Sequence, residues 1–186
     1  MSVSLRENVR AVQEMLTGVV ELEPQVARAA EAIATALLGG HKLLACGNGG
    51  SAADASHLTT EFVCRYSRDR RPYPAISLAT QGGDLTAIGN DYSFDELFAR
   101  QVRAFGLPGD ILVALSTSGK SENVRRALVA AKELGVVTIA FLGRDGGPCA
   151  GLADIELIVP GDVTARIQEG HKLLLHTMCE MVEERI

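Results

Sequence analysis

The sequence of 186 residues lacks the features that mark membrane proteins and nucleic-acid-binding proteins. No apolar run approaches the roughly 20 residues of a membrane-spanning helix, and the chain does not open with a signal-peptide pattern. The only clustered basic residues lie in the short stretch Arg68–Arg71, and the net charge is −5. Because nucleic acids and anionic membranes are bound through basic faces, we expect a soluble protein that binds neither.

Cysteine pairs are missing as well. Cys46, Cys64, Cys149 and Cys179 are widely spaced and form no CxxC motif. Reduced, structural thiols are the simplest interpretation, and they predict a cytoplasmic location.

The composition that remains is typical of an ordinary globular protein. Hydrophobic residues make up 47% and charged residues 22% of the chain. We find no internal repeat and no linker, so residues 1–186 are predicted to form a single domain.

The first 40 residues predict a pair of helices. Apolar residues recur at helical spacing from Leu5 to Leu22, and Pro24 suits the first turn of a second helix that reaches Leu38. Gly39 and Gly40 then end that helix. We expect this N-terminal helical pair to pack on the core or on a partner subunit.

After residue 40, short apolar runs alternate with helical segments. The predicted strands are residues 42–46, 74–78, 110–115, 136–142 and 154–159, and the main predicted helices are residues 51–66, 121–134 and 164–184. Continuous apolar strands separated by helices predict an α/β fold with a doubly wound, flavodoxin-like sheet of five parallel strands. Ligands bind beyond the carboxyl ends of such strands, which directs attention to residues 47–51 and 116–121.

The two loops differ in how much they indicate. Gly47-Asn-Gly-Gly-Ser51 fits a ligand-binding loop or a tight turn capped by Ser51, and its composition leaves both open. Ser116-Thr-Ser-Gly-Lys-Ser121 places four hydroxyls at the start of a helix, more than capping requires, so it predicts phosphate binding. Because the spacing of a nucleotide P-loop is absent, a small phosphorylated metabolite fits better than ATP.

Histidines and a carboxylate gather in two of the predicted helices. His57 and Glu61 share one helical face, either as a solvated pair or as partners of a metal or polar substrate. His171 and His176 lie in the last helix, and this concentration favours a functional role for all three histidines, whereas His41 is interpreted as a surface residue. Gly89-Asn-Asp91 is predicted to form a turn.

Taken in order, these segments resemble the SIS (sugar isomerase) domain family, and within it the phosphoheptose isomerases. The resemblance extends over nearly the whole chain. Its motifs are Gly47–Ser51, Ala53–Glu61, Gly89–Asp91, Ser116–Gly119 with Ser121, and Arg166–Glu169 followed by His171 and His176.

The resemblance implies an isomerase that converts sedoheptulose 7-phosphate to D-glycero-D-manno-heptose 7-phosphate, an early step toward heptose-containing cell-surface glycans. It implies a homotetramer with active sites between subunits, a catalytic pair at Glu61 and His176, and zinc held by His57, Glu61, Gln168 and His176. The implied substrate contacts are Asn48, Gly49, Gly50, Ser51, Glu61, Arg65, Asn90, Asp91, Ser116, Thr117, Ser118, Ser121 and Gln168.

Two details qualify this resemblance. Ala165 stands where some family members carry a carboxylate, so this chain lacks that group. Gln168 and His176 are eight residues apart, about 12 Å along a straight helix, so one metal reaches both more easily from different subunits or from a bent helix.

The competing hypothesis is a non-catalytic SIS-domain regulator that binds a protein such as the bacterial replication initiator. The presence of both Glu61 and His176 favours the enzyme, because a regulator of this kind does not need them.

Overall fold

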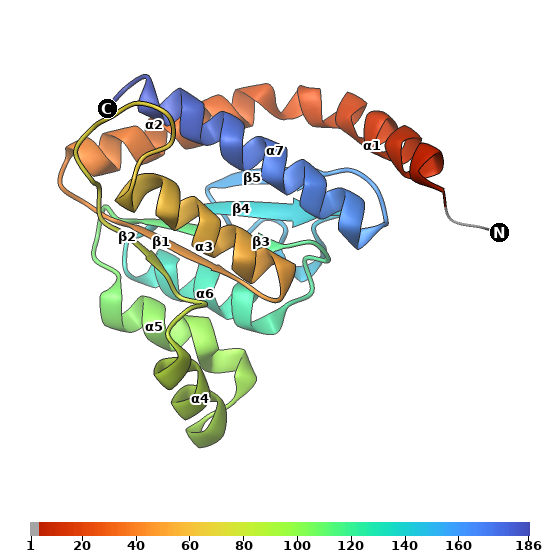
Figure 1. The fold of residues 1–186 in the computed structure, drawn as a ribbon. Helices are drawn as coiled ribbons and strands as arrows, with labels where there is room; N and C mark the ends of the chain where they lie inside the picture. The colour runs from red at the N-terminus through yellow and green to blue at the C-terminus, as the bar shows by residue number, and fades with distance from the viewer. Residues whose placement is uncertain (1–3) are drawn as a thin grey trace.

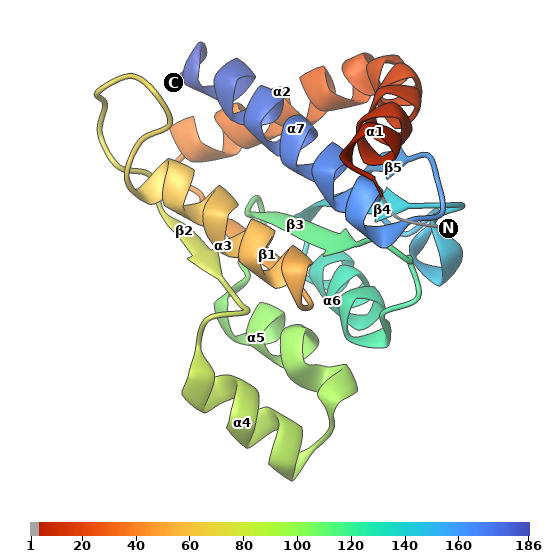
Figure 2. The same ribbon diagram turned by 45° about the vertical axis from the view of Figure 1, so that its right-hand side comes forward.

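The computed structural model describes residues 4–186 and has three layers (Figures 1 and 2). One face of a central sheet is covered by α1 (Leu5–Val19), α2 (Glu23–Leu38), α3 (Gly50–Val63) and α7 (Thr164–Glu183). The other face is covered by α5 (Leu97–Phe105) and α6 (Glu122–Glu133), with α4 (Gly82–Asp91) outside α5. Short 3₁₀ turns form at Val20–Leu22, Phe94–Glu96 and Gly147–Cys149.

The sheet confirms the predicted class. Its strands are β1 (Leu43–Gly47), β2 (Ala75–Ser77), β3 (Ile111–Ser116), β4 (Val137–Gly143) and β5 (Ile155–Val159). They lie in the order β2-β1-β3-β4-β5, and all neighbouring pairs are parallel. This is the flavodoxin-like order.

Alternate residues of the central strands supply two separate cores. Leu43 and Ala45 of β1 belong to the core beneath α1, α2, α3 and α7, while Leu44 and Cys46 belong to the core beneath α5 and α6. The strands are therefore buried on both faces, which explains their continuous apolar runs.

The predicted N-terminal helical pair is present, and its second helix packs against α7. α3 ends at Val63, three residues before the predicted end at Tyr66, because the backbone of Cys64 leaves helical geometry. Among the helices of residues 4–186, none combines the length and apolar character that crossing a bilayer requires.

Candidate functional site

The point where the chain changes winding direction lies between β1 and β3, at the centre of the sheet. From β1 the sheet extends to β2 on one side, and from β3 it extends through β4 to β5 on the other. The loops that follow β1 and β3 therefore meet at the edge where doubly wound folds bind ligands.

The β1–α3 loop exposes its backbone. Gly49 has φ 55° and ψ −120°, a conformation suited to glycine, and a Cβ there would meet no atom within 4 Å. Gly50 packs so closely against the amide of Gln168 that any side chain would clash. Ser51 is buried in the first turn of α3, and no side chain caps the helix, so the capping role considered for Ser51 is wrong. The Ser51 and Ala52 amides instead donate to the backbone carbonyl of Asn48, at 3.0 and 3.3 Å.

The hydroxyls of the β3–α6 loop do not cap their helix either. Ser121 is the N-cap residue of α6, yet its hydroxyl bonds the Ser116 hydroxyl at 3.1 Å and accepts from no amide of the helix. The Val124 amide donates to the side-chain oxygen of Asn123 at 2.9 Å, which leaves the Glu122 and Asn123 amides uncapped by side chains. Ser118 instead accepts a hydrogen bond from the Lys120 amide at 3.2 Å. A helix N-terminus with uncapped amides and adjacent hydroxyls is chemically suited to an anion.

An amide pair that sequence reasoning missed joins the β1–α3 loop to the start of α6. Asn48 and Asn123 exchange two hydrogen bonds of 2.9 Å, each side-chain amide donating to the oxygen of the other. Asn123 is 1% exposed. The spacing of 75 residues carries no periodicity, so only the fold reveals this pair.

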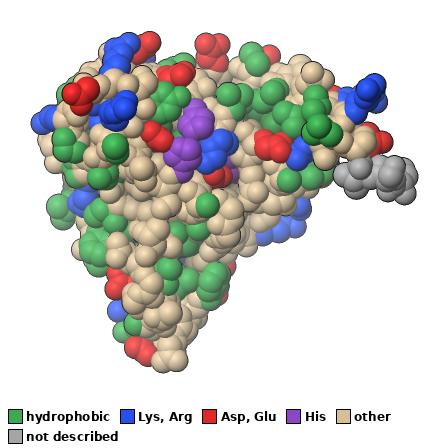
Figure 3. All heavy atoms as spheres, in the orientation of Figure 1, with side chains coloured by type: hydrophobic (Ala, Val, Ile, Leu, Met, Phe, Trp, Pro, Cys, Tyr) green, Lys and Arg blue, Asp and Glu red, His purple; other side chains and the backbone are tan. Residues whose placement is uncertain are grey.

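A second group of polar side chains lies where α3 and α7 run side by side (Figures 1 and 2). His57 Nε2 is 2.7 Å from Glu61 Oε1 and 3.5 Å from His176 Nε2, and the two imidazole rings meet edge to face. Figure 3 shows histidine side chains at the surface over these helices, beside basic and acidic groups. The structure thus brings together three of the predicted site residues in one chain.

Two further residues belong to this group and were missed. Lys172 Nζ lies 2.5 Å from Asp54 Oδ1 and 2.8 Å from His57 Nδ1. The signal was helical spacing, because Gln168, Lys172 and His176 recur every four residues along one face of α7. Asp54 precedes His57 by three residues on the facing side of α3.

Three other predicted residues lie away from this group. Asn90 and Asp91 form the last turn of α4, which packs against α5 in the opposite layer. The predicted turn at residues 89–91 is therefore wrong, and the helix continues to Asp91 because Ile88 still accepts from the Tyr92 amide. Arg65 follows the end of α3 and donates to the Ser67 carbonyl at 2.8 Å, so it does not continue the face of Glu61.

His171 belongs to the core instead of the site. Its side chain is fully buried, its Nε2 contacts the Leu142 carbonyl oxygen at 2.8 Å, and its ring meets Phe141 edge to face. Burial lowers the pKa of His171 below its usual value, so the ring is neutral. The functional role favoured for this histidine is not supported by its position.

The predicted zinc ligands are His57, Glu61, Gln168 and His176. Within residues 4–186, no three His, Cys, Asp or Glu side chains are placed so that they could hold a metal ion. Gln168 lies two turns from His176, against Gly50, and the outer nitrogen of His57 faces the Lys172 ammonium. A histidine that binds zinc normally donates its outer N–H to an acceptor, so this arrangement does not fit zinc.

Comparison with known proteins identifies the family. The SIS domain model matches residues 7–143. The phosphoheptose isomerase of Geotalea daltonii is 48% identical over 183 residues, covering 98% of this chain and 95% of that protein. The phosphoheptose isomerase of a Shewanella species is 48% identical over 179 residues, with 95% and 91% covered.

Solved structures agree. The phosphoheptose isomerase of Neisseria gonorrhoeae superposes with a TM-score of 0.90 at 43% identity, covering 97% of this chain and 100% of that one. The Francisella tularensis phosphoheptose isomerase gives 0.90 at 37% identity, with 98% and 100% covered. The chain therefore belongs to the SIS domain family and, within it, to the phosphoheptose isomerases.

Proposed function

We propose that this protein isomerises sedoheptulose 7-phosphate to D-glycero-D-manno-heptose 7-phosphate, a step toward heptose-containing glycans. The observation that carries the proposal is the grouping of Glu61, His57 and His176, in a chain that is 48% identical to a phosphoheptose isomerase over almost its full length. A carboxylate beside two imidazoles supplies the base and the proton donor that the reaction requires.

The reaction moves hydrogen between two neighbouring carbons. Glu61 removes a proton from C1 of the ketose while His176 protonates the carbonyl oxygen on C2, which gives the enediol. The proton then returns to C2 as the C1 hydroxyl loses its own, and the aldose forms with no net change in atoms or electrons. The N–H of His57, 2.7 Å from Glu61, orients the carboxylate for this transfer.

The phosphate is anchored elsewhere. The uncapped amides of α6 and the hydroxyls of Ser116, Thr117, Ser118 and Ser121 form the proposed phosphate site. The open backbone at Gly49, with Asn48, Gly50, Ser51 and Gln168, contacts the sugar. Holding the distant phosphate fixes the reacting end by position.

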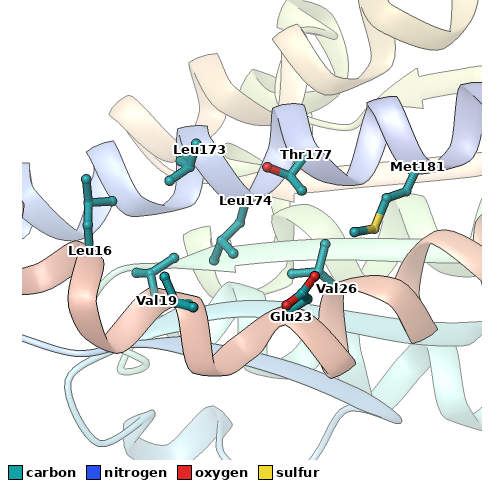
Figure 4. A pocket seen from close by; sticks show the side chains of 9 residues that line it. Leu16, Val19, Glu23, Val26, Leu173, Leu174, Thr177 and Met181 are labelled. Carbon is teal, nitrogen blue, oxygen red and sulfur yellow. The ribbon is translucent and has the colours of Figure 1, made fainter.

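A homotetramer with shared active sites completes this proposal. Glu61 lies eleven residues beyond Gly50, about 16 Å along α3, and Asn90 and Asp91 lie in the other layer. A second copy that supplies Arg65, Asn90 or Asp91 to the site would join these parts. An apolar groove between α1, α2 and α7, lined by residues such as Val19, Val26 and Leu174 (Figure 4), offers a surface for self-association.

Zinc stays a prediction. If bound, the ion would polarise the substrate oxygens, but the arrangement of His57 and Lys172 does not fit it, and no step above requires it. The regulatory alternative is not favoured, because the chain keeps Glu61 and His176 in contact with His57.

The test is turnover of sedoheptulose 7-phosphate by the purified protein, with and without chelator, beside the variant Glu61→Gln. We expect the variant to lose about 10²–10⁴-fold in kcat, because the base is gone, while calorimetry finds substrate affinity nearly unchanged. Glu133→Gln, the same change on the exposed end of α6, is the control and should keep full activity. An active Glu61→Gln protein would refute the assignment, and an inactive wild type with metal restored would point to the regulator.

A further inference from the structure

Lys172 is held between two side chains of the neighbouring helix. Its ammonium lies 2.5 Å from Asp54 Oδ1 and 2.8 Å from His57 Nδ1. Asp54 is buried, while Lys172 and His57 are each about one-third exposed at the surface between α3 and α7. Lys172 thus joins His57 to the buried carboxylate of Asp54, which the proposed reaction does not use.

This contact determines where the proton of His57 sits. A lysine ammonium has three donors and no acceptor, so His57 Nδ1 must accept its hydrogen bond. In the neutral ring the proton is then on Nε2, which lies 2.7 Å from Glu61 Oε1 and donates to it. His176 Nε2, at 3.5 Å, is too distant to compete for that donor. The hydrogen bonds thus form one chain from Lys172 through His57 to Glu61.

The same arrangement bears on metal binding. Zinc at His57 would need the lone pair of Nε2, which the proton occupies, and would move that proton to Nδ1. At Nδ1 that proton would face the Lys172 ammonium, which lies 2.8 Å away. Histidines that bind zinc have a hydrogen-bond acceptor at this position. Zinc could bind at His57 only after Lys172 had moved.

We propose that Lys172 is a positioning residue that fixes His57 as an Nε2–H donor to Glu61 and thereby disfavours a metal ion at this histidine. The kinetic part of this inference rests on the proposed isomerase activity, whereas the tautomer and the metal affinity do not. Lys172 acts through His57, because its ammonium contacts Asp54 and His57.

The first experiment is ¹⁵N NMR of the histidine rings in the metal-free protein, with His57→Gln to assign the signals. We expect His57 to carry its proton on Nε2 in the wild type and to populate both tautomers in Lys172→Met, which keeps the length of the side chain but removes the donor. Lys132→Met, at an exposed position on α6, should leave the ring signals unchanged. A wild-type His57 protonated on Nδ1 would overturn the proposal without any variant.

The second experiment is calorimetric titration of the wild type, Lys172→Met and Lys132→Met with zinc alone. Lys172→Met should bind zinc on the order of tenfold more tightly than the wild type or Lys132→Met, and adding His57→Gln should abolish that gain. Equal zinc affinity in the wild type and Lys172→Met would contradict the inference.

Lys172→Met should also lower kcat on the order of tenfold with KM nearly unchanged, and Lys172→Arg should restore part of the lost kcat. An unreactive wild type would refute the isomerase and leave the first two readouts decisive.

Discussion

Single side chains in this protein take their roles from what they contact. His171 and His176 lie on the same helix, five residues apart, yet His171 contacts a β4 carbonyl in the core and His176 contacts His57 at the surface. A shift of five residues turns a side chain well over a third of the way around a helix, so only one of the two can face α3. The sequence placed both histidines correctly on a helix and could not say which face was buried.

The Asn48–Asn123 pair gives a prediction at this scale. Replacing Asn123 with Ala removes three hydrogen bonds of 2.9 Å, two with Asn48 and one from the Val124 amide. It leaves the Asn48 amide without its partner, a cost of about 1–3 kcal/mol. Because the pair joins the proposed sugar loop to the start of α6, we expect KM for the sugar phosphate to rise about tenfold, with a smaller change in kcat. Steady-state kinetics measures both constants.

The control for this variant is Asn8→Ala, the same chemical change on the exposed surface of α1. It should leave both kinetic constants unaltered. An Asn123→Ala enzyme with a wild-type KM would show that the two loops hold their positions without the amide pair.

At the scale of elements, the pattern of apolar residues predicted most of the fold. The five strands were each located to within one or two residues, because runs such as Ile111–Leu115 are buried on both faces of a parallel sheet. The parts that failed were element ends. Asp91 completes α4 although Asn and Asp favour turns, and Arg65 leaves α3 because the backbone changes direction at Cys64. At helix ends, the local conformational preference of a residue decides little, because contacts with other elements determine the path of the backbone.

The segment after α3 is held by one buried carboxylate. Glu183 of α7 accepts hydrogen bonds from the Ser67 amide, the Ser67 hydroxyl and the Arg68 amide, and it lies 3.4 Å from Arg70 Nε. Burial alone would raise the pKa of Glu183, but hydrogen bonds from Arg68 and Ser67 lower it below 4.5. A carboxylate whose pKa is lower in the folded state stabilises the fold above its unfolded pKa, and this contribution is lost as the pH falls through the folded value.

We therefore expect Glu183→Gln to lower the free energy of unfolding at pH 7 by about 1–3 kcal/mol, because an amide cannot accept as a carboxylate does. The difference from the wild type should shrink as the pH falls, because the carboxyl group is protonated first in the unfolded chain and, at lower pH, in the folded protein. Urea denaturation at pH 7 and at successively lower pH values measures this. Glu184→Gln, at the exposed next residue, should have little effect at any pH, and a deficit in Glu183→Gln that persisted at the lowest pH would rule out a charge effect.

The whole molecule presents the parts of the proposed site on separate surfaces. The phosphate loop lies at the carboxyl edge of the sheet, the Glu61 group lies between α3 and α7, and Asn90 lies at the end of α4 in the opposite layer. The family resemblance implies one site for these residues, but a single chain does not bring them all together. In the proposed oligomer, the remaining contacts depend on how copies of the chain pack, and a sequence pattern does not predict that packing.

Self-association is the property on which the proposed shared site depends. Leu173 is 45% exposed on α7 and borders the apolar groove with Val19 and Leu174 (Figure 4). Placing a charge there by Leu173→Asp would leave an unpaired carboxylate in an apolar contact, which strongly disfavours association. We expect the wild type to have about four times the monomer mass of 19.7 kDa by light scattering and the variant to be smaller.

Isomerase activity of Leu173→Asp should fall with the mass, because a partner no longer supplies its share of the site. Leu107→Asp, at an exposed leucine just after α5, is the control and should keep the wild-type mass. A Leu173→Asp monomer with full activity would show that one chain holds the whole site, and it would require Asn90 and Asp91 to have no part in binding.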